Sequence, residues 1–343
     1  MIRGWLVAAA VVLCLAAGPG RAAGDVIVEG NRFYRDGRPW IAEGVSLVGR
    51  IAPPDRVTKK PSYAAARAAF GPDMLAEVRR YGADLVRLQV SQAALDPKSK
   101  RHDPGYRAEV LDAIAETRAA GYNVIVAMEW KGTAGPTDSK GLPTASTRRA
   151  WRVIAEEFGG DRGVLFELFN EPPDNPRTPA EWVPWQESMQ ATIDALRRAG
   201  AQNVLLAPGM QYSRSLEGAP PLDDPLGQLG YAVHPYLGKH NQTRAQWDKK
   251  WGDHARTYPV MATEFNADAG GNYCRPELAA QAEAILAYMR EKRIGVVAWA
   301  LDMPSVRGPD GSYTTLDALA CGERRDGGRG GAGQMIHEYF LAK

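Results

Sequence analysis

An amide and a carboxyl group, those of Asn170 and Glu171, follow an apolar run that spans residues 164–169. Such a run predicts a strand of a parallel sheet that is covered on both faces. Pro172 and Pro173 end the strand, because proline has no N–H to donate to a neighbouring strand. The carboxyl ends of parallel strands are where α/β proteins carry their chemistry, so both side chains are candidate site residues. A surface Asn-Glu-Pro turn is the alternative.

A second glutamate, Glu264, ends another apolar segment, which spans residues 258–263. Two carboxyl groups on the ends of different strands suit the hydrolysis of a glycosidic bond. The protonated carboxyl group releases the leaving group, while the ionised one attacks the anomeric carbon from the opposite face. The second glutamate therefore favours a catalytic interpretation of Glu171 over a surface turn.

The chain resembles glycoside hydrolase family 5, the cellulase-like enzymes of the large retaining (β/α)8 glycosidase clan. The matching motifs occur in the family's order and cover essentially the whole mature chain: Arg87 in DLVRLQV, Asn170-Glu171-Pro172, His234 and Tyr236 in YAVHPYLG, Glu264 in MATEFN and Trp299 in VVAWALD. One such motif is weak evidence, whereas all of them in order are strong evidence. The resemblance implies a retaining hydrolase whose partner is a polysaccharide or oligosaccharide. No cofactor is expected.

The two glutamates are expected to differ in protonation. Burial predicts a raised pKa for Glu171, which suits the acid/base. Arg87 lies in an otherwise apolar strand and needs a carboxylate partner, because an unpaired buried charge is costly. The resemblance names Glu264, the expected nucleophile, as that partner. A structural pair with Glu167, whose side chain also faces inward, is the alternative.

The resemblance assigns the remaining matching residues to the substrate or to the nucleophile. Asn170 is expected to bind the sugar's 2-hydroxyl group. His234 is expected to line the subsite next to the scissile bond, and Tyr236 to donate a hydrogen bond to the nucleophile. Trp299 is expected to be the floor on which the sugar stacks. Structural roles are the alternatives, in the turn for Asn170, in the strand for His234 and in the barrel core for Trp299.

The end of the third strand departs from the family's pattern. Most relatives carry a histidine there, whereas this chain reads Met128-Glu129-Trp130-Lys131. We expect Lys131 or Glu129 to occupy that space, with Lys131 a substrate-binding candidate. Five tryptophans near loops are either sugar platforms or helix packing, and the sequence does not sort them: Trp130, Trp182, Trp185, Trp247 and Trp251.

Other catalytic classes lack their signatures. The five histidines show no His-x-His or His-Glu-x-x-His spacing, so no metal site is expected. The chain also has no Gly-x-Ser-x-Gly sequence, which argues against an esterase.

The elements that must position these residues alternate between strand and helix. We expect strands near residues 41–47, 84–90, 123–129, 164–170, 203–207, 230–233, 260–264 and 295–301. We expect helices near residues 72–81, 106–120, 147–158, 182–199, 243–254, 276–293 and 333–341, and a poorly marked one at 213–216. This rhythm predicts an α/β fold, a (β/α)8 barrel. An open sheet would carry a nucleotide-binding glycine pattern at its first turn, and residues 47–50 have none.

An N-terminal β-hairpin is expected over residues 26–40, which alternate in polarity and contain Gly-Asn and Asp-Gly turn signals. It would cap the amino-terminal end of the barrel. Residues 24–343 are expected to form a single catalytic domain, because no composition shift, repeat or Ser/Thr/Pro linker marks a second one.

Residues 1–23 are expected to form a signal peptide, with Arg3 before an apolar stretch and small residues at its end. A retained membrane anchor is the alternative, but the apolar run is short for a bilayer. Loss of Arg3 and Arg21 lowers the formal charge from +2 to 0. A mature chain without net charge gives no electrostatic reason to expect binding to nucleic acid or to a membrane surface. We expect a secreted or periplasmic monomer.

Two cysteines, Cys274 and Cys321, remain after export, on loops that follow the seventh and eighth strands. An oxidising compartment predicts a disulfide between them, with two free thiols as the alternative. The expected activity is that of an endo-β-1,4-glucanase. A β-mannanase, an exo-β-glucosidase and a catalytically silent glycan-binding barrel are the alternatives.

Overall fold

A closed barrel of eight parallel strands forms the centre of the computed structural model, which describes residues 23–52, 61–130, 141–238, 241–267, 277–316 and 331–342. Around the barrel the strand order is β10-β11-β4-β5-β6-β7-β8-β9. The strands are β4 (Glu43–Leu47), β5 (Leu85–Ser91), β6 (Asn123–Glu129), β7 (Val164–Glu167), β8 (Leu205–Pro208), β9 (Leu229–Val233), β10 (Val260–Phe265) and β11 (Gly295–Ala298). The predicted (β/α)8 fold is confirmed.

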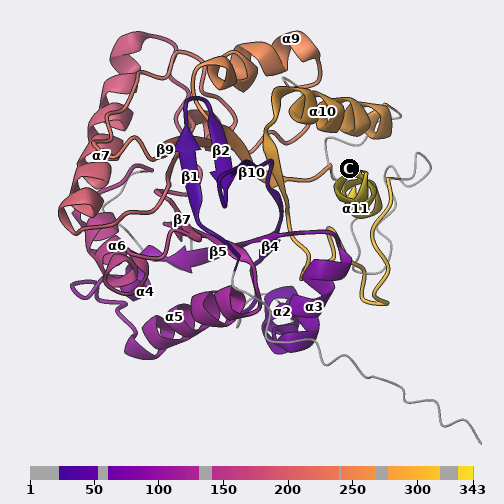
Figure 1. The fold of residues 1–343 in the computed structure, drawn as a ribbon, viewed down its shortest axis with the longest axis horizontal. Coiled ribbons are helices and arrows are strands. Elements are labelled where there is room, and N and C mark those ends of the chain that lie inside the picture. Colours follow the sequence, from indigo (N-terminus) through magenta and orange to yellow (C-terminus); the bar gives the residue numbers. More distant parts are fainter. Residues whose placement is uncertain are drawn as a thin grey trace, which may run out of the picture.

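Helices surround this barrel (Figure 1). They are α2 (Pro61–Ala69), α3 (Pro72–Arg80), α4 (Gln92–Leu95), α5 (Pro104–Ala119), α6 (Ala145–Phe158), α7 (Pro179–Arg198), α8 (Met210–Ser213), α9 (Arg244–Trp247), α10 (Leu278–Lys292) and α11 (Gly333–Leu341). A π turn (Asp248–Gly252) and a 3-10 turn (His254–Arg256) follow α9. The sequence did not predict α2 or α4, and it predicted one regular helix where α9 and the two turns lie.

The expected helix at 213–216 is wrong. The short α8 ends at Ser213, and Gln211, Tyr212 and Ser213 have φ values of 58°, 60° and 58°. Left-handed backbone cannot continue a right-handed helix, so the chain turns here instead.

The predicted strand 164–170 ends as a regular strand at Glu167, and the predicted strand 295–301 ends at Ala298. Beyond Glu167 the chain still follows the barrel, because Leu168 donates to the Leu206 carbonyl and Asn170 donates to the Met128 carbonyl. Glu171 then takes a φ of 52°, which turns the chain out of the strand direction.

The amino-terminal end of the barrel is closed by the antiparallel strands β1 (Val26–Glu29), β2 (Arg32–Arg35) and β3 (Arg38–Pro39). Val26, Val28, Phe33 and Trp40 pack in one cluster with residues from the interior of the barrel. These interior residues are Leu85, Ile125, Leu165, Val204, Leu206, Ala232, Met261 and Val297. The hairpin lies over the centre of the barrel in Figure 1, so the opposite end is left for a site.

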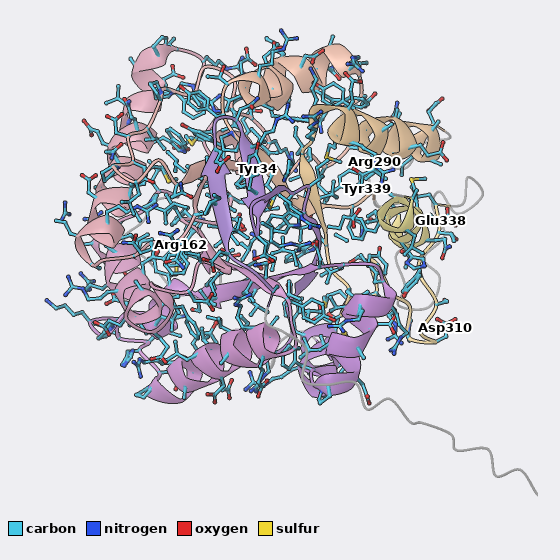
Figure 2. All side chains as sticks on the ribbon, viewed as in Figure 1. Tyr34, Arg162, Arg290, Asp310, Glu338 and Tyr339 are labelled. Atoms are coloured by element: carbon cyan, nitrogen blue, oxygen red, sulfur yellow. The ribbon has the colours of Figure 1, made fainter. Side chains whose placement is uncertain are left out.

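The ring of helices is completed by α11, which lies between α10 and α3 (Figure 1). The Arg290 guanidinium of α10 stacks on the ring of Tyr339 in α11, 3.9 Å from its centroid (Figure 2). Tyr81, at the end of α3, donates a hydrogen bond of 2.6 Å to the Gly333 carbonyl and packs edge-on against Phe340. No helix among these described residues has the length and apolar content needed to cross a bilayer.

Candidate active site

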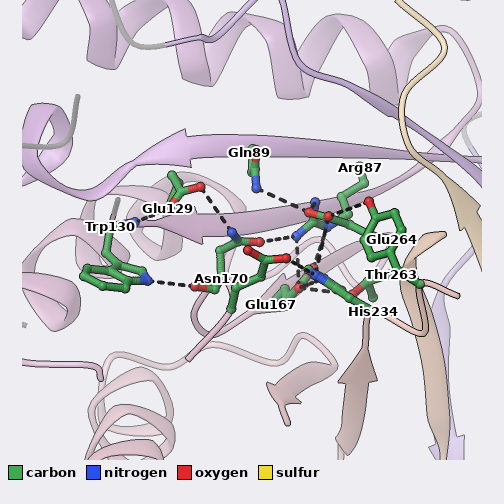
Figure 3. Close-up of polar contacts among 11 residues, drawn as sticks. Arg87, Gln89, Glu129, Trp130, Glu167, Asn170, His234, Thr263 and Glu264 are labelled. Carbon is green, nitrogen blue, oxygen red and sulfur yellow. Dashed lines mark hydrogen bonds and ion pairs between the residues drawn. The ribbon is translucent and has the colours of Figure 1, made fainter. Parts of the chain in front are cut away.

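Polar side chains from four strands meet at the carboxyl ends of the strands. Arg87 comes from β5, Glu167 from β7, Glu264 from β10, and Asn170 and His234 from the residues that follow β7 and β9. Figure 3 shows their side chains directed toward one another inside the barrel. The strands themselves fix this convergence, since alternate residues of a barrel strand point inward.

Arg87 is fully buried and binds two carboxylates at once. Its Nε and one terminal nitrogen donate to Glu167 at 2.7 and 3.0 Å, and the other terminal nitrogen donates to Glu264 at 2.7 Å. A further bond of 2.9 Å reaches Asn170 Oδ1. Burial opposes the charge, but Glu167 and Glu264 raise the pKa of Arg87 above its ordinary value. Both partners considered from the sequence are therefore present.

Glu167 is a site residue that the sequence indicated only as a structural alternative. Its carboxylate is fully buried, and it accepts a hydrogen bond from the Thr263 hydroxyl at 3.1 Å in addition to those from Arg87. Burial acts to raise the pKa of Glu167, but Arg87 and His234 outweigh it and lower the pKa to about 2. Glu167 is therefore a carboxylate at neutral pH, and it faces both Arg87 and His234.

Glu264 lies between several donors. Its Oε1 accepts from Arg87 and, at 3.4 Å, from Gln89 Nε2, while its Oε2 accepts from the Tyr236 hydroxyl at 3.0 Å. Burial raises the pKa of Glu264, and the positive charges of His234 and Arg87 act against that rise. Gln89 was not predicted as a site residue. It lies two positions after Arg87 on the same strand and so faces the same side, which is a signal that the sequence does carry.

His234 lies between three carboxyl groups. Its Nδ1 is 3.1 Å from Glu171 Oε1 and 3.4 Å from Glu264 Oε2, and its Nε2 is 3.5 Å from Glu167 Oε1. Burial of the ring opposes the charged form, but Glu264 and the other two carboxyl groups raise the pKa of His234 to about 9. The imidazole is therefore a cation at neutral pH.

Glu171 is the most accessible of these carboxyl groups, with 22% of its side chain exposed against 5% for Glu264 and 0% for Glu167. One donor atom each from Glu171, His234 and Glu264 lies within 4.8 Å of the other two. The two carboxyl groups thus face each other across a narrow gap.

Asn170 connects Arg87 to the end of β6. Its Nδ2 donates to Glu129 Oε2 at 3.1 Å, and Glu129 Oε1 accepts the Trp130 backbone N–H at 2.9 Å. Trp130 also donates its indole N–H to the Asn170 carbonyl at 2.9 Å (Figure 3). Glu129, one of the two side chains expected at the end of the third strand, therefore occupies that place. The other, Lys131, lies outside the described residues, as do Cys274 and Cys321.

The structure sorts the tryptophans that the sequence left open. Trp182, Trp185, Trp247 and Trp251 are buried among the helices. Trp130 and Trp299 are partly exposed, the first stacked on Phe169 and the second packed beside Val48, Tyr63 and Ala300. Trp299 follows β11, the neighbour of the strand that carries Glu264. Trp130 follows β6, the neighbour of the strand that leads to Glu171.

A family model described as Cellulase (glycosyl hydrolase family 5) matches residues 62–305, which include all of these side chains. The chain belongs to glycosyl hydrolase family 5. The family resemblance expected from the short motifs is therefore confirmed. Family 5 is a retaining family.

Relatives and solved structures agree with this assignment. A manganese dependent endoglucanase of Phanerodontia chrysosporium is 34% identical over 142 residues, which cover 36% of this chain and 34% of that protein. The matched regions span about a third of the curated relatives' length. A β-glucanase of Saccharophagus degradans, also solved with cellotetraose, superposes with a TM-score of 0.66 at 21% identity over 95% of both chains.

A mannanase catalytic domain from Streptomyces sp. SirexAA-E superposes with a TM-score of 0.58 at 18% identity, over 87% of this chain and 86% of that one. At these identities the superpositions show the (β/α)8 fold and do not distinguish between sugars.

Proposed function

We propose that this protein is a retaining β-glycosidase that hydrolyses β-1,4-linked glucan by double displacement, with Glu171 as the acid/base and Glu264 as the nucleophile. The observation that carries the proposal is the pair of carboxyl groups whose facing atoms lie within 4.8 Å. In retaining enzymes the two carboxyl groups stand only about 5–5.5 Å apart, because no water has to fit between the nucleophile and the sugar.

In the first step Glu171 gives its proton to the glycosidic oxygen, and the bond from that oxygen to the anomeric carbon breaks. Glu264 attacks the same carbon from the opposite face and forms a glycosyl ester. In the second step the Glu171 carboxylate takes a proton from water, the water oxygen bonds to the anomeric carbon, and Glu264 is released as a carboxylate. The configuration at the anomeric carbon is inverted twice and so retained.

The charges of the cluster support this division of roles. Arg87 and His234 carry two positive charges, and Glu167 and Glu264, which Arg87 contacts directly, balance them as carboxylates. A proton on Glu171 then leaves the five groups neutral. The greater exposure of Glu171 suits a group that must reach a leaving oxygen and later a water molecule.

Four neighbours act on the reacting sugar or on the nucleophile. The Tyr236 hydroxyl, 3.0 Å from Glu264 Oε2, orients the attacking carboxylate. Asn170, held next to the acid/base, donates to the 2-hydroxyl group of the sugar. Trp299 follows the strand next to that of Glu264, and Trp130 follows the strand next to the one that leads to Glu171, which suits sugar stacking near each of the two carboxyl groups.

The relatives favour glucan as the substrate, because their names include endoglucanases and a β-glucanase solved with cellotetraose. Mannan is the second candidate, since mannanases share the fold. The decisive measurement is a screen of the purified protein on carboxymethylcellulose, mannan, β-1,3-glucan and aryl β-glycosides. Hydrolysis of carboxymethylcellulose supports the proposal, preference for mannan reassigns the sugar, and inactivity on every substrate leaves a glycan-binding barrel.

Manganese does not fit the cluster as a catalytic cofactor. Glu171, His234 and Glu264 offer donor atoms close together, but Glu264 is already bound by Arg87 and Tyr236. The raised pKa of His234, to about 9, also means that a metal ion would have to displace its proton. The proposed reaction therefore has no step that uses a metal ion.

We also propose that the protein is exported, with residues 1–23 removed as a signal peptide. The support is the sequence: a charged start, an apolar stretch and a small-residue end. Amino-terminal sequencing of the protein from culture medium and from periplasm tests both the cleavage and the compartment.

A further inference from the structure

The side chain of Asn170 is held between two groups of opposite charge. The Arg87 guanidinium donates to Asn170 Oδ1 at 2.9 Å, and Asn170 Nδ2 donates to the Glu129 carboxylate at 3.1 Å (Figure 3). The two ends of an asparagine amide have nearly the same shape, so only their partners decide which end faces which way. Here a rotated amide would place its N–H groups against a guanidinium and its oxygen against a carboxylate.

Only a carboxylate satisfies both donors at this strand end. Glu129 Oε1 accepts the Trp130 backbone N–H at 2.9 Å, and Oε2 accepts from Asn170. A glutamine of the same shape would present an NH₂ group to one of these two donors. Glu129 is 3% exposed, and a buried ionised carboxylate is costly unless hydrogen bonds hold it. A carboxylate at this place therefore indicates a function that a neutral side chain cannot perform, namely accepting hydrogen bonds from both donors.

We propose that Glu129 is a positioning residue, which fixes the amide of Asn170 so that the second N–H of Nδ2 points to the substrate. This inference rests on the proposed function, because the donor is useful only if a sugar hydroxyl lies beside it. Asn170 Oδ1 is occupied by Arg87 and one Nδ2 hydrogen by Glu129, so within the described part of the chain the amide keeps one further donor in a fixed direction. Glu129 thereby governs a contact of the reacting sugar without touching the sugar.

Glu129→Gln tests the proposal with almost no change in volume. Because the backbone of Trp130 cannot turn, the side chain of Asn170 is the donor that gives way. We expect kcat/KM to fall about tenfold or more, the usual consequence of an unmatched buried polar group, with the larger part of the fall in kcat. Glu129→Asp keeps two acceptor oxygens on a shorter stem and should recover part of the loss.

A double-mutant cycle separates positioning from a merely structural role. In an Asn170→Ala background, Glu129→Gln should cause no further loss of kcat/KM, because the residue through which it acts is gone. Losses that multiply in the double variant would overturn the proposal. Glu77→Gln is the matched control, since Glu77 is also a buried carboxylate, bonded to Arg80 and the Tyr313 hydroxyl on the outside of the barrel. It should lower the melting temperature and leave kcat/KM unchanged.

A crystal structure of Glu129→Gln judges the inference even if the wild-type protein proves inactive on every β-glycan. Asn170 should have rotated, with its Arg87 bond broken or lengthened beyond hydrogen-bond distance. An Asn170 side chain that keeps both contacts would refute the positioning role. Inactive wild-type protein would instead refute the proposed function, so the two failures are distinguishable.

Discussion

His234 Nδ1 lies 3.1 Å from Glu171 Oε1, and the same nitrogen lies 3.4 Å from Glu264 Oε2. One imidazole therefore faces both carboxyl groups that the proposed reaction uses. Because the pKa of His234 is raised to about 9, a positive charge lies between them at neutral pH. The protonation of this ring therefore affects both the stability of the fold and the charge next to the two carboxyl groups.

Replacing each glutamate should have a different effect. Glu264→Ala should lower kcat on every substrate by about 10⁵-fold or more, the scale on which loss of a nucleophile acts. Glu171→Ala should impair substrates with poor leaving groups most, because an activated aryl glycoside needs no acid. The glycosyl-enzyme should then accumulate, mass spectrometry should detect it, and azide should speed its release. Equal behaviour of both variants on the activated substrate would contradict the assignment, as would a first product of inverted configuration.

Stability should fall as the pH rises through the pKa of His234. The folded-state pKa of about 9 exceeds the ordinary 6.5, so the protonated ring stabilises the fold. This contribution is complete below pH 6.5 and is lost between pH 6.5 and 9, and its size is on the order of 3 kcal/mol. Urea unfolding from pH 6 to 9.5 measures it. In His234→Asn the fall over this interval should be smaller, and an unchanged fall would contradict the prediction.

The acid limb of the kcat/KM profile should follow Glu264. Burial raises the pKa of this carboxyl group above 4.5, and the nucleophile works only when ionised, so activity should decline as pH falls through that raised value. Tyr236→Phe removes a donor to the carboxylate and should move the acid limb to higher pH. A limb that does not move in this variant would show that another group controls it.

Glu167→Gln should destabilise the protein strongly without touching the proposed nucleophile. Removing one partner of a buried ion pair costs about 3–5 kcal/mol, because Arg87 then lies buried with less compensating charge. Calorimetry should show a clear fall in melting temperature, and kcat/KM should fall as Arg87 shifts from Glu264. Asp224→Asn, which weakens the Arg197 pair outside the barrel, is the control that should spare activity. Unchanged stability in Glu167→Gln would refute this account.

Metal removal should leave the activity unchanged. Dialysis against EDTA followed by assay with and without Mn²⁺ is the measurement, with metal analysis of the protein as the control for complete removal. Restoration of activity by Mn²⁺ alone would mean that Glu171, His234 and Glu264 hold a metal ion and that the proposed proton transfers need revision.

Strand parity and the ends of strands allowed much of the site to be predicted from the sequence. Arg87 inside an apolar strand required a buried carboxylate, and the structure supplies two, those of Glu167 and Glu264. A guanidinium has five N–H groups and needs more acceptors than one carboxylate provides. The donors of Arg87 alone therefore predict a second buried acceptor, and Glu167 is the inward-facing carboxylate that meets this need.

The remaining features depend on packing that the sequence does not express. Trp130 and Trp185 both lie near loops in the sequence, yet Trp185 of α7 is buried and Trp130 is partly exposed beside the catalytic strand ends. The four residues of α4 form one short helix with Ser91 as its cap, too brief for a periodic signal. The left-handed backbone at residues 211–213 was likewise not predictable, because none of these residues is a glycine.

The hydrogen bond from Tyr81 to the Gly333 carbonyl joins residues 252 positions apart. Bringing such distant segments together costs loop-closure entropy before any contact compensates for it, so contacts of this kind form slowly. We therefore expect α11 to dock against Tyr81 late in folding, after the strands between them have paired. Until it docks, the apolar surface around Tyr81 stays uncovered, and we expect chaperones to protect the chain during this interval.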